Sequence, residues 1–227
     1  IRSLEDYKEA YRYSMSDPDS FWAERADAYQ WSTRWTKVSQ PDFIQAHNQW
    51  YLGGKLNITV NCLDRHLDRH GDETAIIWEP SEPMQETRKL TYKELYKAVC
   101  SFANGLNANG IKKGDRICFY MPMVPELVIG ILACARIGAI HSVVFAGFSA
   151  ASLADRIKDA SCNMVICADY NVRGSKQIPV KTVVDEALAS GCPGVEKVIV
   201  YRNTGGSIPW VSGRDIWWYE VTEGQDD

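Results

Sequence analysis

Short apolar runs alternate with longer amphipathic stretches from about residue 74 onward. The apolar runs predict strands at 74–78, 116–120, 139–145, 164–168 and 197–201. The stretches between them predict helices that begin near residues 91, 125, 152 and 180. Strands separated by helices of about ten to fifteen residues indicate right-handed βαβ units on a parallel sheet. The run Met164–Cys167 is apolar at successive positions, which is typical of a strand covered on both faces. We therefore expect an α/β fold.

Local capping residues set several helix ends in this pattern. Thr91 and Glu94 have the spacing of a capping box, and Gly110 follows the helix that they begin. Ser149 is the expected N-cap of the helix over 152–159. Residues 61–69 predict one further helix, stopped by His70-Gly71-Asp72.

The first 60 residues follow a different pattern. Ser3 and Asp6 form a weaker capping box for a helix over 4–14, and Asp17-Pro18 begins a second helix that runs to about residue 28. An irregular, aromatic-rich segment then extends to Gly54. We therefore divide the chain into a mostly helical N-terminal extension, residues 1–60, and an α/β portion, residues 61–227. The tail from Asn203 is rich in turn residues and ends in a polar, acidic stretch, so we expect the α/β portion to be incomplete at its C-terminus.

Composition narrows the class of protein. The formal net charge is −4 and basic residues are scattered, which argues against a general nucleic-acid binder. No apolar run approaches the roughly 20 residues that a membrane helix requires. The 7 cysteines include no C-x-x-C pair. We interpret them as reduced, mostly buried thiols of a cytoplasmic protein and expect no zinc site.

Common catalytic motifs are absent from the sequence. It contains no G-x-x-x-x-G-K-[ST] phosphate loop, no G-x-G-x-x-G after a strand and no G-x-S-x-G nucleophile elbow. His66 and His70 have a spacing that can bind a metal, but a solvated helix face is the favoured interpretation. For His141, a satisfied strand histidine is favoured over a catalytic base. Thr204–Ser207 is interpreted as a turn. We assign no catalytic residue and no metal ligand.

Two segments that follow apolar strands are candidates for ligand binding. The first, 143–149, contains small residues that permit close backbone approach. The second, 171–176, offers the cations Arg173 and Lys176 to a phosphate. Carboxyl ends of parallel strands meet at one edge of a sheet, where ligands bind. For Arg173–Lys176, an ordinary charged surface loop remains the favoured alternative on pattern alone.

The sequence also resembles a known family. Residues 54–57 (GKLN), 61–66 (NCLDRH), 120–126 (YMPMVPE) and, most strongly, 133–149 (ACARIGAIHSVVFAGFS) are similar to AMP-forming acetate–CoA ligases, the acetyl-coenzyme A synthetases. This family belongs to the adenylate-forming (ANL) superfamily. The resemblance extends over essentially the whole chain. Propionyl-coenzyme A synthetases are the close alternative.

The resemblance implies a reaction in two steps. Acetate attacks the α-phosphate of Mg-ATP, which gives acetyl-adenylate and pyrophosphate. The thiol of coenzyme A then attacks the adenylate carbonyl and AMP leaves. The family's phosphate loop, acetate pocket, Mg2+ ligands and C-terminal catalytic lysine have no match in these residues. We therefore expect an N-terminal segment that is inactive alone, whose partners are acetate, ATP, coenzyme A and the remainder of the same polypeptide.

The resemblance also implies which residues contact coenzyme A. The matching positions form two groups: Phe145, Ala146 and Gly147 along the coenzyme, and Arg173, Gly174, Ser175 and Lys176 at its nucleotide end. Ala146 and Ser175 depart from glycines of the family pattern. The rival hypothesis is a non-catalytic module that binds coenzyme A or another phosphorylated ligand, and a weaker one is an interaction scaffold without a ligand.

Overall fold

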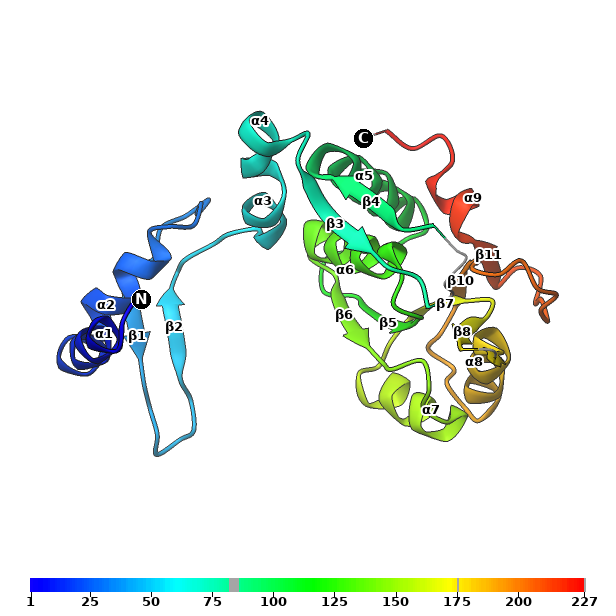
Figure 1. The fold of residues 1–227 in the computed structure, drawn as a ribbon. Coiled ribbons are helices and arrows are strands. Elements are labelled where there is room, and N and C mark those ends of the chain that lie inside the picture. The colour runs from blue at the N-terminus through cyan, green and yellow to red at the C-terminus, as the bar shows by residue number, and fades with distance from the viewer. Residues whose placement is uncertain (82–85, 175, 227) are drawn as a thin grey trace. The chain divides into compact units, whose positions relative to one another are not determined.

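The chain folds into two units in a computed structural model that describes residues 1–81, 86–174 and 176–226 (Figure 1). Unit 1 is Ile1–Cys62 and unit 2 is Leu63–Asp227, whereas the sequence placed the division after residue 60. Ser175, one of the expected site residues, lies outside the described residues. Each unit is described by itself.

Unit 1 begins with the two expected helices. Its elements are α1 (Leu4–Ser16), α2 (Pro18–Ala26), β1 (Lys37–Gln40), β2 (Gln49–Leu52) and α3 (Ile58–Cys62). The capping box of α1 is confirmed: the Asp6 amide donates to Ser3 Oγ at 3.1 Å, and the Ser3 amide donates to Asp6 Oδ2 at 3.1 Å. Each bond satisfies a backbone donor that the first helical turn leaves free.

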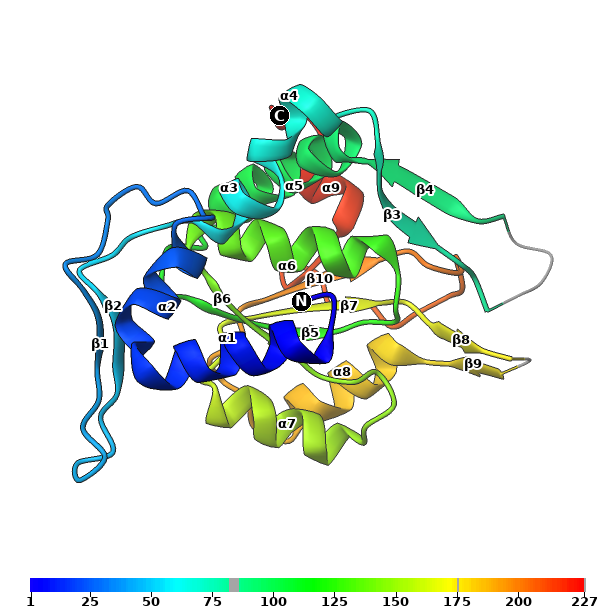
Figure 2. The same cartoon turned by 60° about the vertical axis from the view of Figure 1, so that its left-hand side comes forward.

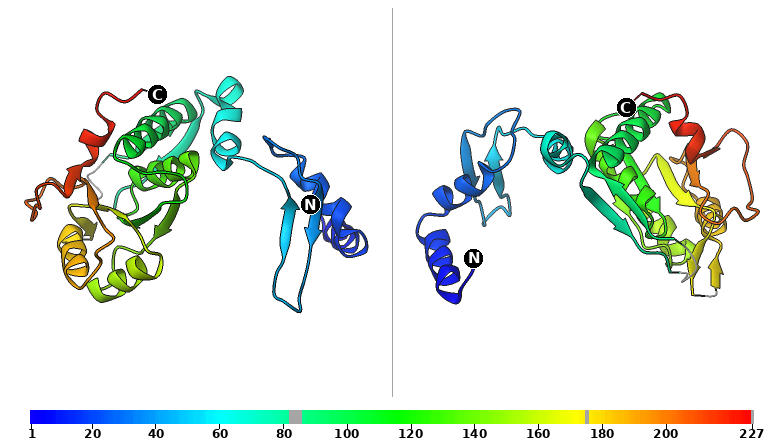
Figure 3. Two further views of the ribbon diagram at one scale, coloured as in Figure 1. Left: turned by 180° about the vertical axis from the view of Figure 1, so that it is seen from behind. Right: turned by 45° about the horizontal axis from the view of Figure 1, so that its top comes forward.

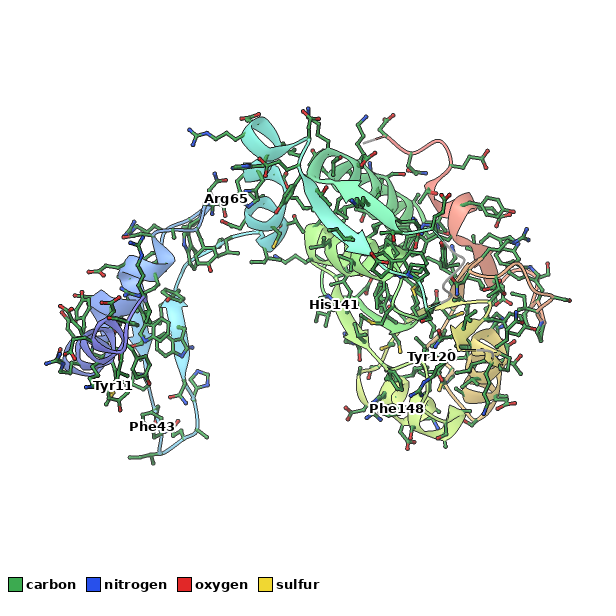
Figure 4. All side chains as sticks on the ribbon, in the orientation of Figure 1. Tyr11, Phe43, Arg65, Tyr120, His141 and Phe148 are labelled. Atoms are coloured by element: carbon green, nitrogen blue, oxygen red, sulfur yellow. The ribbon has the colours of Figure 1, made fainter. Side chains whose placement is uncertain are left out.

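The irregular segment expected after α2 contains an antiparallel hairpin instead. Strands β1 and β2 pair in the register Lys37↔Leu52 and Ser39↔Trp50. The tip of the connection carries Phe43, as Figure 4 shows. The strands have four residues each and β1 buries only Val38, so too few apolar positions recur to reveal a strand period. Aromatic rings supply the packing, with the Trp31 and Trp35 centroids 4.9 Å apart.

Unit 2 is built on a five-stranded parallel sheet with the spatial order β11-β10-β7-β5-β6. The strands are β5 (Arg116–Tyr120), β6 (Ile140–Val143), β7 (Met164–Ala168), β10 (Lys197–Tyr201) and β11 (Asp215–Trp217). Of these five strands, β5 comes first in the chain, and it lies between the next two, β6 and β7. The order therefore reverses between β5 and β7, which defines a doubly wound sheet with its switch point at these two strands.

Helices cover both faces of this sheet (Figure 2). The helices α5 (Tyr92–Ala108), α6 (Pro125–Ile137) and α9 (Trp218–Thr222) pack on one face, and α7 (Ala150–Asp159) and α8 (Val180–Ala189) on the other. Strand β5 shows the consequence: Ile117 and Phe119 enter one core, whereas Cys118 and Tyr120 enter the other. The expected α/β class with two-sided burial is confirmed.

Two antiparallel pairs project from unit 2. Strand β3 (Thr74–Trp78) pairs with β4 (Arg88–Thr91), and β8 (Asn171–Arg173) pairs with β9 (Lys176–Ile178). The views in Figures 2 and 3 place both pairs at the same end of the unit. The pair β8–β9 replaces the loop expected at 171–176.

The helix expected over 61–69 is interrupted. Helix α3 ends at Cys62, and a 3₁₀ turn (Asp64–His66) and α4 (Leu67–His70) follow. Leu63 has φ −124° and ψ −66°, outside the helical region, and its side chain is buried. Asp64 is not on a solvated helix face, because it accepts a hydrogen bond of 2.6 Å from Arg136 of α6. Tertiary packing therefore overrides the local helical pattern here.

The tail contains two elements that the sequence pattern did not predict. Strand β11 completes the five-stranded sheet and α9 follows it directly. The Trp218 ring of α9 stacks on Phe102 of α5 with centroids 3.6 Å apart. A three-residue strand is too short to show a period, so only its pairing with β10 defines it.

A buried group of ions joins the tail to α8. The ammonium of Lys181 is fully buried and lies 2.8 Å from Asp185 and 2.9 Å from Asp215. Arg214 Nε lies 2.6 Å from Asp215. Burial alone would raise the pKa of Asp215, but the hydrogen bonds from Arg214, the Val211 amide and Lys181 outweigh it and hold that pKa below its ordinary value.

All seven cysteines are free thiols, six of them buried, as expected. In the part of the chain that the structure describes, no helix has the length and apolar character needed to cross a membrane.

We expect Gly105→Ala to destabilise the chain although alanine is the better helix former. A Cβ at position 105 of α5 would overlap the carbonyl oxygen and Cγ1 of Val221 in α9. The overlap should lower the free energy of unfolding by about 2 kcal/mol. Urea titration monitored by circular dichroism measures this loss. The control Asn107→Ala, at an exposed position of the same helix, should be neutral or slightly stabilising. Equal midpoints for both variants would contradict the packing described.

We expect Asp215→Asn to change the dependence of stability on pH. Because the folded pKa is depressed, the carboxylate contributes stability above its unfolded pKa of about 4, and this is lost as the pH falls through the folded value. The variant should lose about 3 kcal/mol at neutral pH and show a flatter acid limb. Thermal unfolding between pH 2 and pH 7 tests this. Asp68→Asn, at an exposed position of α4, should match the wild type, and an unchanged acid limb in Asp215→Asn would contradict the assignment.

Candidate functional site

A cavity of about 790 Å³ opens at the carboxyl ends of the parallel strands. Its walls come from the end of β3, from the segments after β5, β6 and β10, and from β8, which follows β7 in the chain. It therefore lies at the switch point of the sheet. Met121 and Leu127 give it an apolar floor. Among the lining residues that the structure describes, the two charged side chains are Glu79 and Arg173. The cavity is therefore shaped to enclose a largely apolar group and to meet an anion at its rim.

Phe145 forms the wall that follows β6. Its ring is largely exposed, and it meets Phe148 edge-on with centroids 5.8 Å apart. The amides of Gly147 and Phe148 both donate to the Phe145 carbonyl, at 2.7 and 3.1 Å. A Cβ at position 147 would overlap the Phe145 ring. Glycine at 147 thus lets the Phe145 ring lie over the backbone.

Ala146 is buried, unlike Phe145 before it. It lines the cavity, but its side chain is buried in the core on the α7–α8 face. The Tyr120 hydroxyl donates to the Phe148 carbonyl at 2.7 Å and anchors the segment, and Figure 4 labels both residues. Burial raises the pKa of Tyr120, so the hydroxyl keeps the proton that it donates.

The second expected segment is a tight hairpin. Arg173 and Lys176 pair directly across β8 and β9, so two cations lie side by side at the tip. Gly174 has φ +59°, a left-handed conformation that favours glycine. Arg173 lines the cavity together with Phe145 and Ala146, whereas Gly147, Gly174 and Lys176 do not. The structure therefore brings both predicted segments to one cavity, but only some residues of each segment line it.

The wall from β3 and β4 had no counterpart in the sequence reasoning. Trp78 Nε1 donates to the Met123 carbonyl at 2.7 Å. Beside it, Arg88 binds the buried carboxylate of Glu126 at 2.8 Å. The hydrogen bonds that Arg88 donates to Glu126 raise the pKa of Arg88, so the guanidinium keeps its charge. This ion pair fastens the β3–β4 hairpin to the N-terminus of α6 and so fixes one side of the cavity.

Asp169 was also missed. It directly follows β7, is fully buried, and accepts hydrogen bonds from the segment after β10. A signal was present in the sequence: an acidic residue stands at the end of an entirely apolar strand. Asp169 binds Asn203, Thr204 and Gly205, and so holds the first part of the segment Thr204–Ser207 that was interpreted as a turn.

The histidines lie away from the cavity lining. The ring centroids of His66 and His70 are 6.1 Å apart, and His70 Nδ1 is 2.9 Å from Glu73 Oε1. His141 is exposed on the edge strand β6 (Figure 4). Across the described ranges, no three His, Cys, Asp or Glu side chains gather closely enough to hold a metal ion, so we assign no residue to Mg2+.

The fold and the cavity define a doubly wound α/β protein with a cavity at the switch point of its parallel sheet. Comparison with known families identifies it further. The family described as AMP-binding enzyme matches residues 63–220, and the family described as acetyl-coenzyme A synthetase N-terminus matches residues 7–62. The chain belongs to the AMP-binding enzyme family.

Individual relatives agree with this assignment. Acetyl-coenzyme A synthetase 2 of Pseudomonas putida is 51% identical over 98% of this chain and 34% of its own length. Acetyl-coenzyme A synthetase of Alkalilimnicola ehrlichii is 50% identical over 95% of this chain and 33% of its own length. The solved acetoacetyl-CoA synthetase from Streptomyces lividans superposes with a TM-score of 0.85 at 26% identity, covering 95% of this chain and 32% of that one. The chain spans about a third of the length of these relatives.

Proposed function

We propose that this chain is the N-terminal part of an acetate–CoA ligase. The full protein makes acetyl-CoA from acetate, ATP and coenzyme A through an acetyl-adenylate, with release of pyrophosphate and AMP. Residues 61–227 form the α/β portion of its large N-terminal domain, and residues 1–60 are an extension. The observation that carries the proposal is the meeting of Phe145 and Arg173 in one cavity at the switch point, in a chain half identical to acetyl-coenzyme A synthetases.

The residues of the two segments have complementary roles in this proposal. Arg173 and Lys176 provide adjacent cations that hold the phosphates of coenzyme A by charge-assisted hydrogen bonds. Phe145 lies over Gly147 and forms an apolar wall along the pantetheine arm. Ala146 contributes backbone to the wall while its side chain stays in the core. Ser175 belongs to the phosphate-binding group by its sequence position.

The chemistry explains the need for such a site. A carboxylate is a poor acyl donor until AMP provides a good leaving group. Mg2+, when bound in the full protein, neutralises charge on the ATP phosphates. The thiol of coenzyme A must then reach the adenylate carbonyl, and a cavity that fixes both ends of the coenzyme reduces the entropy lost in that encounter.

An ATP–pyrophosphate exchange assay compares the activity of this chain with that of the full protein. We expect the chain alone to catalyse no ATP–pyrophosphate exchange with acetate, because the sequence has no counterpart of the family's phosphate loop or catalytic lysine. The longer polypeptide that carries this chain should catalyse it. Exchange measured with acetate and with propionate in parallel determines the preferred acid. Clear turnover by the chain alone would contradict the proposal, as would no turnover by the longer polypeptide with either acid.

We expect Arg173→Ala to weaken coenzyme A binding. Loss of one charge-assisted hydrogen bond should cost about 1.5–3 kcal/mol, which raises Kd roughly tenfold or more. Isothermal titration of the chain with coenzyme A measures the effect. Arg69→Ala, on α4, removes the same charge from an exposed position away from the cavity lining and is the matched control. Equal Kd values for the two variants would contradict the role of Arg173 in coenzyme A binding. Binding of coenzyme A without exchange activity in the longer polypeptide would favour a non-catalytic binding module.

A further inference from the structure

One buried carboxylate connects two walls of the cavity. Asp169 is the first residue after β7, and the chain continues from it through Tyr170 into β8, which carries Arg173. Its side chain has no exposed surface. Its oxygens accept from the amides of Asn203 at 2.8 Å, Thr204 at 3.1 Å and Gly205 at 2.7 Å. These three donors belong to the segment that follows β10 and forms another part of the rim.

Further contacts make the attachment specific. The Tyr170 amide donates to Asp169 at 2.6 Å, and Thr204 Oγ1 donates at 3.3 Å. The Tyr170 hydroxyl donates to the Ser207 carbonyl at 2.7 Å, and Asn203 Nδ2 donates to the Tyr170 carbonyl at 3.0 Å. A Cβ at Gly206 would overlap the Tyr170 ring. Two consecutive residues therefore hold the whole of segment 203–207 against the start of the β8–β9 hairpin.

We propose that Asp169 is a positioning residue for the coenzyme A cavity. It sets the spacing between the Asn203–Thr204 wall and the Arg173 wall, and it touches no ligand itself. The effect on coenzyme A rests on the proposed function above, whereas the coupling of the two walls does not. Both walls line the same cavity, so a ligand that spans it requires their spacing to be fixed before it binds.

The carboxylate is suited to this role by its acceptor capacity. Two oxygens offer about four lone-pair sites. The donors here are the amides of Tyr170 and of the consecutive residues Asn203, Thr204 and Gly205, together with the Thr204 hydroxyl. An asparagine would keep one acceptor oxygen and place an NH2 donor against an amide donor. Asp169→Asn therefore keeps the shape of the side chain but breaks part of the attachment, because two donors then face each other inside a buried site.

Amide hydrogen exchange on the full chain tests the coupling without a ligand. In Asp169→Asn, we expect exchange to speed up on the order of tenfold at residues 203–205 and also at 171–173. Leu106→Ala is the control, since Leu106 of α5 is buried in the core and is not among the residues that line the cavity. It should lower global stability without a selective effect on either segment. Faster exchange at 203–205 with no change at 171–173 would overturn the coupling, as would unchanged exchange at both.

Titration with coenzyme A tests the consequence for binding. Asp169→Asn should raise Kd on the order of tenfold, whereas Leu106→Ala should leave it unchanged at temperatures well below its Tm. An unchanged Kd in Asp169→Asn would overturn the role in the ligand site. If the longer polypeptide that carries this chain binds no coenzyme A, the proposed coenzyme assignment fails and the exchange result alone decides the positioning role. If Asp169→Asn does not fold, Thr204→Val removes the hydroxyl, which donates to Asp169 and accepts from the Gly206 amide. This variant should speed exchange at 203–205 by a smaller factor, and no change there would overturn the attachment.

Discussion

Burial of the parallel sheet on both faces is the constraint on which the rest of the structure depends. Alternate residues of β5, β7 and β10 enter two separate cores, so neither face of the sheet can meet a ligand. Each large side chain buried in this way contributes about 1.5–3 kcal/mol, and the central strands are apolar along most of their length. Ligands can reach the backbone only at the strand ends. The reversal of strand order between β5 and β7 separates the flanking connections there and leaves room for the cavity.

The elements that could be predicted from sequence are those whose determinants are local. Helix α5 is recognisable because Thr91 and Glu94 cap it within one turn, and the central strands because four or five apolar residues follow one another. The short strands β1, β8, β9 and β11 carry no such signal. Their residues extend because a neighbouring strand satisfies their backbone groups, and the identity of that neighbour is a property of the fold. The break at Leu63 has the same origin, since burial of its side chain outweighs the helical preference around it.

The same distinction applies to the site. Phe145 and Arg173 lie in segments that follow the apolar strands β6 and β7, so their place at the carboxyl edge could be inferred from the pattern, although their role could not. The partners of Trp78 and Asp169 could not be inferred in this way, because Met123 and Asn203 are 45 and 34 residues away in the chain. A resemblance to relatives points to coenzyme A for the first pair of residues. Only the folded chain brings the supporting residues together, and these determine whether the walls of the cavity keep their spacing.

The order of strands in the sheet has a consequence for biosynthesis. After β5 and β6 pair, β7 adds beside β5, β10 beside β7 and β11 beside β10. Each new strand joins an open edge, and none must be inserted between strands that are already paired. The sheet can therefore grow in the direction of translation while the chain leaves the ribosome. The stacking of Trp218 on Phe102 then joins α9, which follows the five strands in the chain, to α5, which precedes them.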